Sequence, residues 1–204
     1  LMFLLILSGI AVFFYGLWYF GKDLPDYKEL SKYNPNVVSR IHAGNGALLA
    51  EYATQKRVFV PISVIPKKVI NAFISAEDKD FYYHFGIDLM ATLRALITNV
   101  KNIGTNKRLI GASTITQQVA KNFLLSSEMS YERKIKEAIL AIRIERAFTK
   151  NEILELYLNE IYLGFKSYGV AAAALNYFDK SLDNLDLSEA AFLAALPKAP
   201  NNYN

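Results

Sequence analysis

The first twenty residues, LMFLLILSGIAVFFYGLWYF, form an apolar run without one charged side chain. A run of this kind can cross a bilayer as a helix, and at 1.5 Å per residue it would be about 30 Å long, the thickness of the hydrocarbon core. Aromatic side chains crowd its second half, as at a membrane interface. The alternative is a cleaved signal peptide, which has a shorter apolar region and a small-residue cleavage site. We predict a transmembrane anchor over residues 1–20.

The rest of the chain divides by composition into three parts. Residues 21–36 are polar, contain two prolines and are predicted to be a tether. Over residues 37–62, two runs of β-forming residues flank Gly44-Asn45-Gly46, a sequence that suits a hairpin turn because Asn-Gly tolerates positive φ. Residues 63–204 have helical periodicity. The prediction is a mostly α domain with a small N-terminal β-hairpin region.

Helix start and stop signals are frequent in that domain. A long helix is expected from about Tyr131 to Ala147. The next helix, which follows Thr149, is expected to stop at Gly164. Two starts have the capping-box spacing of a cap residue followed three positions later by glutamate. The predicted first residues or caps are Pro66, Asp88, Ser113, Thr149 and Asp186.

Composition limits the chemistry. The net charge of +4 is mild and fits an anionic membrane surface or substrate better than a nucleic-acid groove, so no nucleic-acid partner is expected. Cysteine is absent, which excludes disulfides and thiolate metal sites. The two histidines, His42 and His84, are far apart in sequence, so a zinc site is not expected.

The stretch FISAEDKDFYYHFG, residues 73–86, places a carboxylate where apolar residues are expected. Helical spacing continues the stripe of Phe73 and Ile74 onto Glu77, beside Phe81 and the tyrosines that follow. Desolvation there would raise the pKa of the Glu77 carboxyl toward the range of a general base or acid. The alternative is a helix-end carboxylate that turns to solvent.

The segment GASTITQQVAKN, residues 111–122, has neutral hydrogen-bonding groups along one side and a cation at the end. Such a series suits a sugar-phosphate ligand, although an ordinary solvated helix face remains the alternative. The residues concerned are Ser113, Thr114, Gln117, Gln118 and Lys121.

Five other residues have no catalytic signal of their own. Arg133 and Glu137 stand at i, i+4, where an exposed pair contributes only about 0.3–0.5 kcal/mol and usually has no function. His84 is expected to be a hydrogen-bonded structural group. Tyr157 and Asn159 are expected to pack, with Asn159 bonding a neighbouring backbone.

Four segments together resemble the peptidoglycan glycosyltransferase domain of bifunctional class A penicillin-binding proteins. They are AEDKDFYYHFGID, GASTITQQVAKN, RKIKE and EILELYLNEIYLG, in the family's order and spacing. The resemblance implies a lysozyme-like α fold that polymerises lipid II into β-1,4-linked glycan strands, with inversion at the donor anomeric carbon and release of polyprenyl pyrophosphate.

The resemblance also implies residue roles. Glu77 aligns with the general base that deprotonates the acceptor 4-hydroxyl, and Glu137 with a second essential carboxylate that organises the pyrophosphate side through a divalent metal, expected to be Mg²⁺. The family's substrate contacts match Gln118, Lys121, Asn122, Arg133 and Lys134. Its supporting motif residues match Asp78, Phe81, His84, Gly86, Tyr157 and Asn159.

The implied setting is the outer face of the bacterial cytoplasmic membrane, with lipid II, the nascent glycan strand and other cell-wall synthesis proteins as partners. Met129 stands where the family commonly has Arg or Lys, so a neighbouring cation must substitute for it. No S-x-x-K motif occurs, so any transpeptidase would lie beyond Asn204.

Two other classes stay open. A lytic transglycosylase or lysozyme-type enzyme would cleave glycan with Glu77 as its acid, without needing the cations. A non-catalytic envelope scaffold would not need either glutamate. Moenomycin, which mimics the donor in this family, should bind tightly only to the polymerase.

Overall fold

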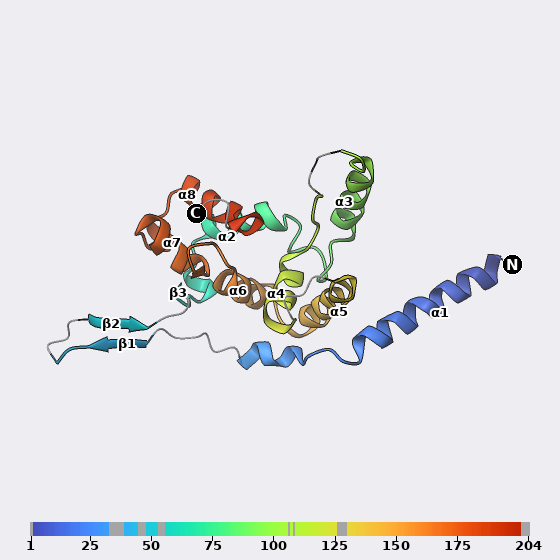
Figure 1. The fold of residues 1–204 in the computed structure, drawn as a ribbon, viewed down its shortest axis with the longest axis horizontal. Helices are drawn as coiled ribbons and strands as arrows, with labels where there is room; N and C mark the ends of the chain where they lie inside the picture. The colour runs from blue at the N-terminus through green and yellow to red at the C-terminus, as the bar shows by residue number, and fades with distance from the viewer. Residues whose placement is uncertain are drawn as a thin grey trace.

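The protein is mostly helical, as predicted (Figure 1). The computed structural model describes residues 2–32, 39–44, 48–52, 56–105, 107, 109–125 and 130–200. Its α-helices are α1 (Met2–Gly21), α2 (Lys67–Glu77), α3 (Leu89–Lys101), α4 (Ile115–Leu124), α5 (Tyr131–Ala147), α6 (Lys150–Glu160), α7 (Val170–Phe178) and α8 (Leu187–Ala195). Short 3₁₀ helices are η1 (Tyr27–Lys32), η2 (Ile62–Val64), η3 (Leu182–Asn184) and η4 (Leu196–Lys198).

One hydrophobic core lies among α2, α4, α5, α6, α7 and α8. Helix α2 packs on α8, while α4 packs on both α5 and α6. Burying a side chain of the size of leucine or phenylalanine contributes about 1.5–3 kcal/mol. Fully buried members of this core are Val69, Phe73, Ile115, Leu140, Ile153, Leu154 and Leu193.

Helix α3 stands at the edge of the domain (Figure 1). Within it only Ala95 is buried, and its apolar stripe is exposed to solvent. The exposed members of the stripe are Leu89, Met90, Leu93, Leu96, Ile97 and Val100. A helix with six exposed large apolar side chains presents a surface typical of an interaction site.

Most predicted helix signals are confirmed. The Asp88 side chain accepts a hydrogen bond from the Ala91 amide, and capping boxes begin α6 at Thr149 and α8 at Asp186. Two predictions are wrong. Thr114, not Ser113, caps α4, because the Thr114 hydroxyl accepts from the Gln117 amide.

The second error concerns the end of α6. The helix ends at Glu160, four residues before the predicted stop. Gly164 instead lies in the following turn with a φ of 89°, where glycine is favoured. The turn continues through Phe165 and Lys166, which also have positive φ.

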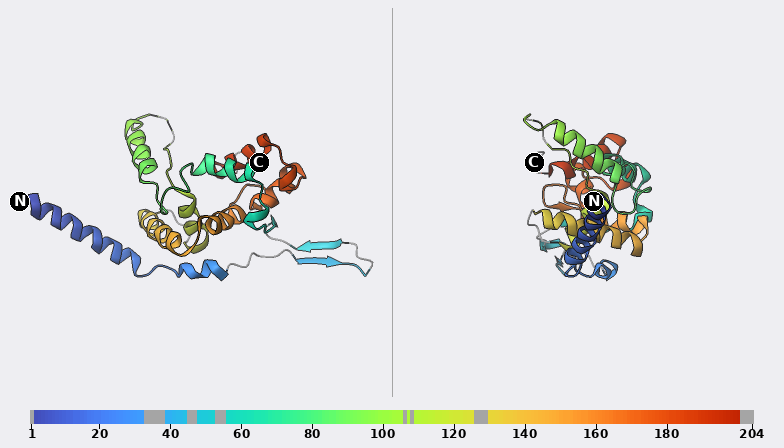
Figure 2. Two further views of the ribbon diagram at one scale, coloured as in Figure 1. Left: turned by 180° about the vertical axis from the view of Figure 1, so that it is seen from behind. Right: turned by 90° about the vertical axis from the view of Figure 1, so that its right-hand side faces the viewer.

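The described residues also form two small two-stranded sheets. Strands β1 (Ser39–His42) and β2 (Leu48–Tyr52) are antiparallel, as the hairpin prediction requires, although turn residues 45–47 lie outside the described residues. The hairpin projects from the domain (Figure 2). Strands β3 (Lys56–Arg57) and β4 (Ser167–Tyr168) pair in parallel.

The predicted tether contacts the domain. Leu30 of η1 is buried in the core, and Leu24 and Tyr27 pack against it. Arg143 of α5 donates a hydrogen bond of 3.2 Å to the Gly21 carbonyl at the end of α1. Apolar contacts and a hydrogen bond therefore hold the segment that follows α1 on the domain.

Helix α1 covers nearly all of the predicted anchor, and its N-terminal end extends away from the other helices (Figures 1 and 2). Among the residues that the structure describes, no helix meets the combined length and apolarity required of a membrane span.

Candidate active site

Glu77 is the last residue of α2 and is partly buried. Its carboxylate accepts a hydrogen bond of 2.7 Å from Nε2 of Gln118 on α4. Burial raises the pKa of the Glu77 carboxyl, while the bond from Gln118 and the charges of Lys121 and Lys198 lower it. The net effect is a raised pKa, in the direction that the apolar stripe predicted.

The aromatic residues after Glu77 were predicted to lie beside its carboxylate, and the structure arranges them differently. Phe81 is fully buried in the core. Tyr82 is half exposed, Tyr83 is 86% exposed and Phe85 is 80% exposed. The segment is a series of turns, so helical spacing does not continue past Glu77 and cannot direct these rings toward it.

Asp78 and His84 close the turn that follows Glu77. Asp78 accepts a bond of 2.9 Å from the Ile115 amide and lies 2.9 Å from Nε2 of His84. The Thr114 hydroxyl donates to the Gly86 carbonyl at 2.6 Å. Gly86 has a φ of 83°, and a Cβ there would lie 2.7 Å from the backbone of Ala141. His84 is thus the hydrogen-bonded structural group that the sequence predicted.

Lys150 supports the same turn from α6. Its Nζ donates to the His84 carbonyl and to Glu145, each at 2.7 Å, and lies 4.4 Å from the centre of the Phe81 ring. Sequence reasoning missed Lys150, because its partners are more than sixty positions away, apart from Glu145.

A buried carboxylate surrounded by cations lies on α5. Glu137 is 1% exposed, 3.1 Å from Nε of Arg133, and paired with Nζ of Lys134. Lys134 also donates to the Ser113 hydroxyl at 3.1 Å. Burial lowers the pKa of Lys121, and the charge of Glu137 opposes that effect. These residues form one cation cluster, whereas the sequence suggested an exposed helix pair.

The donor set around Glu137 does not fit a resident Mg²⁺. Magnesium takes oxygen ligands in an octahedral arrangement, and here two cations already hold the single carboxylate. The described part of the chain contains no group of three or more His, Cys, Asp or Glu side chains that could hold a metal. The predicted role of Mg²⁺ stays a prediction, and no step below uses a metal.

The polar residues of α4 divide between two tasks. Thr114 and Gln117 bond to each other across the helix start: the Thr114 amide donates to the Gln117 side chain, and the Gln117 amide to the Thr114 hydroxyl. Gln118, Lys121 and Asn122 instead line a pocket. Gln117 therefore takes part in the cap through its side-chain oxygen and its backbone N–H, and its predicted contact with substrate stays a prediction.

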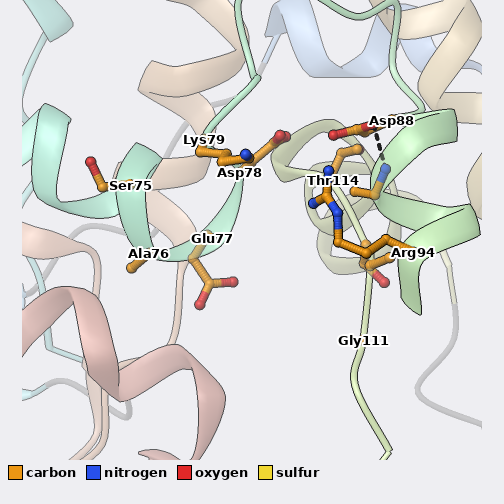
Figure 3. Close-up of a pocket in the computed structure, with 12 residues that line it drawn as sticks. Ser75, Ala76, Glu77, Asp78, Lys79, Asp88, Arg94, Gly111 and Thr114 are labelled. Carbon is orange, nitrogen blue, oxygen red and sulfur yellow. Dashed lines mark hydrogen bonds between the residues drawn. The ribbon is translucent and has the colours of Figure 1, made fainter. Parts of the chain in front are cut away.

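The candidate site residues line two pockets. Pocket A, of about 230 Å³, lies between the end of α2, α3 and the segment before α4, with Glu77 and Arg94 on its two sides (Figure 3). Its lining comprises residues 75–79, Asp88, Ala91, Arg94 and residues 111–114.

Pocket B, of about 330 Å³, lies on the α4 side. It is lined by Gln118, Lys121, Asn122, Glu160, Ile161, Tyr162, Tyr168, Pro197 and Pro200. Glu77 lines pocket A and its partner Gln118 lines pocket B, so the carboxylate belongs to the boundary between them. Sequence reasoning did not single out Lys79, Arg94, Tyr162, Tyr168 or Pro197, because tertiary contacts alone bring them together.

Tyr157 and Asn159 support the fold, as predicted. Tyr157 is 1% exposed and packs edge-to-face on Phe73. The Asn159 amide accepts from the Val60 N–H at 2.8 Å and donates to the Val60 carbonyl at 2.9 Å. It thereby pairs with the chain after β3 as a strand would.

The chain is similar in sequence to proteins of a known family. The Transglycosylase family model matches residues 45–204. Proteins named penicillin-binding protein 1A are 54% identical over 200 residues in Rickettsia felis, 50% over 196 in Aquifex aeolicus and 47% over 202 in Neisseria flavescens. These alignments cover 98%, 96% and 97% of this chain, but 25%, 26% and 25% of the relatives. The chain thus spans about a quarter of the length of the curated relatives it matches.

Among solved structures, the crystal structure of penicillin-binding protein 1A from Haemophilus influenzae matches with a TM-score of 0.41 and 28% identity, over 84% of this chain and 16% of that chain. The family model covers more than half of the chain, and it includes Glu77, the cation cluster and both pockets. The chain therefore belongs to the Transglycosylase family.

Proposed function

We propose that this chain is a peptidoglycan glycosyltransferase that polymerises lipid II into β-1,4-linked glycan. The observation that carries the proposal is the meeting of a desolvated carboxylate, Glu77, with a cation cluster built on Glu137. Transfer of a sugar from a lipid pyrophosphate needs both a base for the acceptor hydroxyl and positive charge for the leaving group.

In this mechanism Glu77 takes the proton of the acceptor 4-hydroxyl. The freed oxygen attacks the donor anomeric carbon from the face opposite the pyrophosphate, the glycosidic bond forms with inversion, and the bond to the pyrophosphate breaks. Lys121, Arg133 and Lys134 stabilise the charge on the leaving group, with Glu137 fixing their positions. Met129 lies outside the described residues, and Lys134 and Arg133 are the nearest candidates to replace the cation that the family has there.

The fold is proposed to be the lysozyme-like fold of this enzyme class, attached to the bacterial cytoplasmic membrane by residues 1–20 on its outer side. Two features support the membrane setting. The α1 sequence is uncharged, and the apolar stripe of α3 is exposed. A lipid-linked substrate would then reach the site without leaving the bilayer. The nascent glycan strand and other cell-wall synthesis proteins are the proposed partners.

A lytic enzyme is the second candidate, because a raised pKa of Glu77 also suits a general acid. Glycan cleavage by one acid would leave the ion pairs of buried Glu137 with Arg133 and Lys134 without a task, and a scaffold would have no need of either glutamate. The cation cluster favours synthesis over both.

The test uses the anchored chain in detergent with purified lipid II, and separately with preformed glycan. Polymer on a gel from lipid II, with no shortening of preformed glycan, is the expected result. Shortening of the glycan without polymer would establish the lytic candidate instead. Neither product, together with failure to bind moenomycin, would indicate a scaffold.

A further inference from the structure

Pocket A contains a cation that the mechanism above does not use. Arg94 extends from α3 into the pocket, opposite Glu77 (Figure 3). Its side chain is exposed, and within the described part of the chain it makes no hydrogen bond or ion pair. A guanidinium inside a concave site, with its five donors unused, is equipped to bind a ligand.

The carboxylates that share pocket A already have partners. Asp88 accepts from the Ala91 amide at 2.8 Å at the start of α3, and Asp78 accepts from His84 and from the Ile115 amide at the start of α4. Each carboxylate lies at a helix N-terminus, where the helix dipole stabilises negative charge. Neither carboxylate forms an ion pair with Arg94 in the described part of the chain.

The pocket is continuous with the proposed reaction centre on two sides. Glu77 lines it directly. Ser113 also lines it and accepts the bond from Lys134, which belongs to the cation cluster on Glu137. A group held by Arg94 would thus belong to a molecule that also contacts Glu77.

We propose that Arg94 binds an oxygen anion of the lipid-linked substrate, a phosphate or a carboxylate, and so holds one substrate in pocket A against Glu77. The planar fork of a guanidinium matches both anions through two parallel N–H···O bonds. The inference rests on the proposed function, because the lipid-linked substrate is the one that function requires. Arg94 is thereby a substrate-binding residue in addition to the cations of α4 and α5.

The first test compares the kinetics of lipid II polymerisation by wild type, Arg94→Ala, Arg94→Lys and Lys101→Ala. Lys101 is the matched control, since it is an exposed cation on the same helix outside the pocket. Loss of a charge-assisted pair predicts a KM about tenfold higher for Arg94→Ala with kcat within about twofold. Arg94→Lys should recover part of the loss, and Lys101→Ala should match wild type. An unchanged KM for Arg94→Ala, or an equal rise for Lys101→Ala, would refute the proposal.

The second test separates this inference from the proposed function. Binding of fluorescent lipid II is measured for Glu77→Gln and for Glu77→Gln with Arg94→Ala, so that no turnover is needed. Weaker binding by the double variant supports the anion site even if wild type makes no polymer. Equal binding by the two refutes the site even if wild type polymerises lipid II.

A lipid-linked disaccharide without its peptide identifies the anion. If the Arg94→Ala effect persists with that substrate, the partner is a phosphate. If the effect disappears, the partner is a carboxylate of the peptide. Both results support the proposal, whereas it is overturned if Arg94→Ala has no effect with intact lipid II and none with the peptide-free substrate.

Discussion

At the scale of single residues, the site depends on how two glutamates are buried. Glu77 is partly buried with one neutral donor, Gln118, so that its pKa is raised. Glu137 is fully buried against two cations. Desolvation raises the pKa of the Glu77 carboxyl, while the ion pairs hold the Glu137 side chain between Arg133 and Lys134.

Replacing Gln118 by leucine should shift the pH dependence of polymerisation. A base acts only when ionised, so activity is lost as the pH falls through the Glu77 pKa. The bond from Gln118 favours the ionised form, and its removal raises that pKa further. The acidic limb of the kcat/KM profile should therefore move to higher pH. Asn122→Leu is the control, because it also removes a side-chain amide from pocket B but one that does not bond to Glu77. It should leave the acidic limb at the same pH, whatever it does to the rate. An acidic limb that does not move in Gln118→Leu would contradict the account.

Removing the Glu137 charge should destabilise the fold. Glu137→Gln breaks a buried ion pair, because it removes the carboxylate charge 3.1 Å from Nε of Arg133, whose side chain is only 14% exposed. The expected loss in the free energy of unfolding is about 3 kcal/mol, measured by urea denaturation. Glu132→Gln is the control on the same helix, where an exposed i, i+4 pair with Lys136 contributes only about 0.3–0.5 kcal/mol. Equal losses for the two variants would mean that the burial of Glu137 is unimportant.

At the scale of elements, the helices follow from local signals in the sequence. Capping boxes at Thr149 and Asp186 and the cap at Asp88 were all predicted, because each signal lies within four residues. The start of α4 was misplaced by one residue, although Thr114 has a glutamine three positions later, at Gln117, and so has the capping-box spacing that Ser113 lacks. Ser113 instead accepts a hydrogen bond from Lys134.

The turn between α2 and α3 should tolerate no side chain at Gly86. A Cβ there would lie 2.7 Å from the carbonyl group of Ala141, which is backbone and cannot move aside, and the φ of 83° adds strain. Gly86→Ala should lower the free energy of unfolding by about 2 kcal/mol or more. Gly111→Ala, where nothing lies within 4 Å of the new Cβ, should change stability little. A melting temperature for Gly86→Ala equal to that of Gly111→Ala would show that the turn is free to adjust.

At the scale of the whole molecule, the sequence predicted the fold class and the chemistry better than the geometry of the site. Motifs identified Glu77 and the cations, because they are runs of adjacent residues. The burial of Glu137, the support of Lys150 and the position of Arg94 depend on contacts between distant segments, for which one sequence has no local signal. The part of Gln117 in the cap was missed, although its spacing from Thr114 is that of a capping box.

The exposed stripe of α3 should help to bind the enzyme to lipid. Replacing Leu93 and Leu96 by glutamate should weaken binding to anionic lipid vesicles severalfold, because two apolar side chains become charged. Leu175→Glu, an exposed leucine on α7, is the control. Co-sedimentation with vesicles measures the effect, and equal binding by the α3 double variant and wild type would exclude α3 from the membrane contact.

The central claim is that Glu77 is the base of a lipid II polymerase, and Glu77→Gln tests it most directly. The substitution keeps the shape and the contact with Gln118 while removing the ability to accept the proton. Glycan polymer made from lipid II is followed on a gel, with circular dichroism confirming that the variant is folded. The account predicts polymer from wild type and a rate about 10²–10⁴-fold lower for the variant. Equal polymer from a folded Glu77→Gln protein would contradict it.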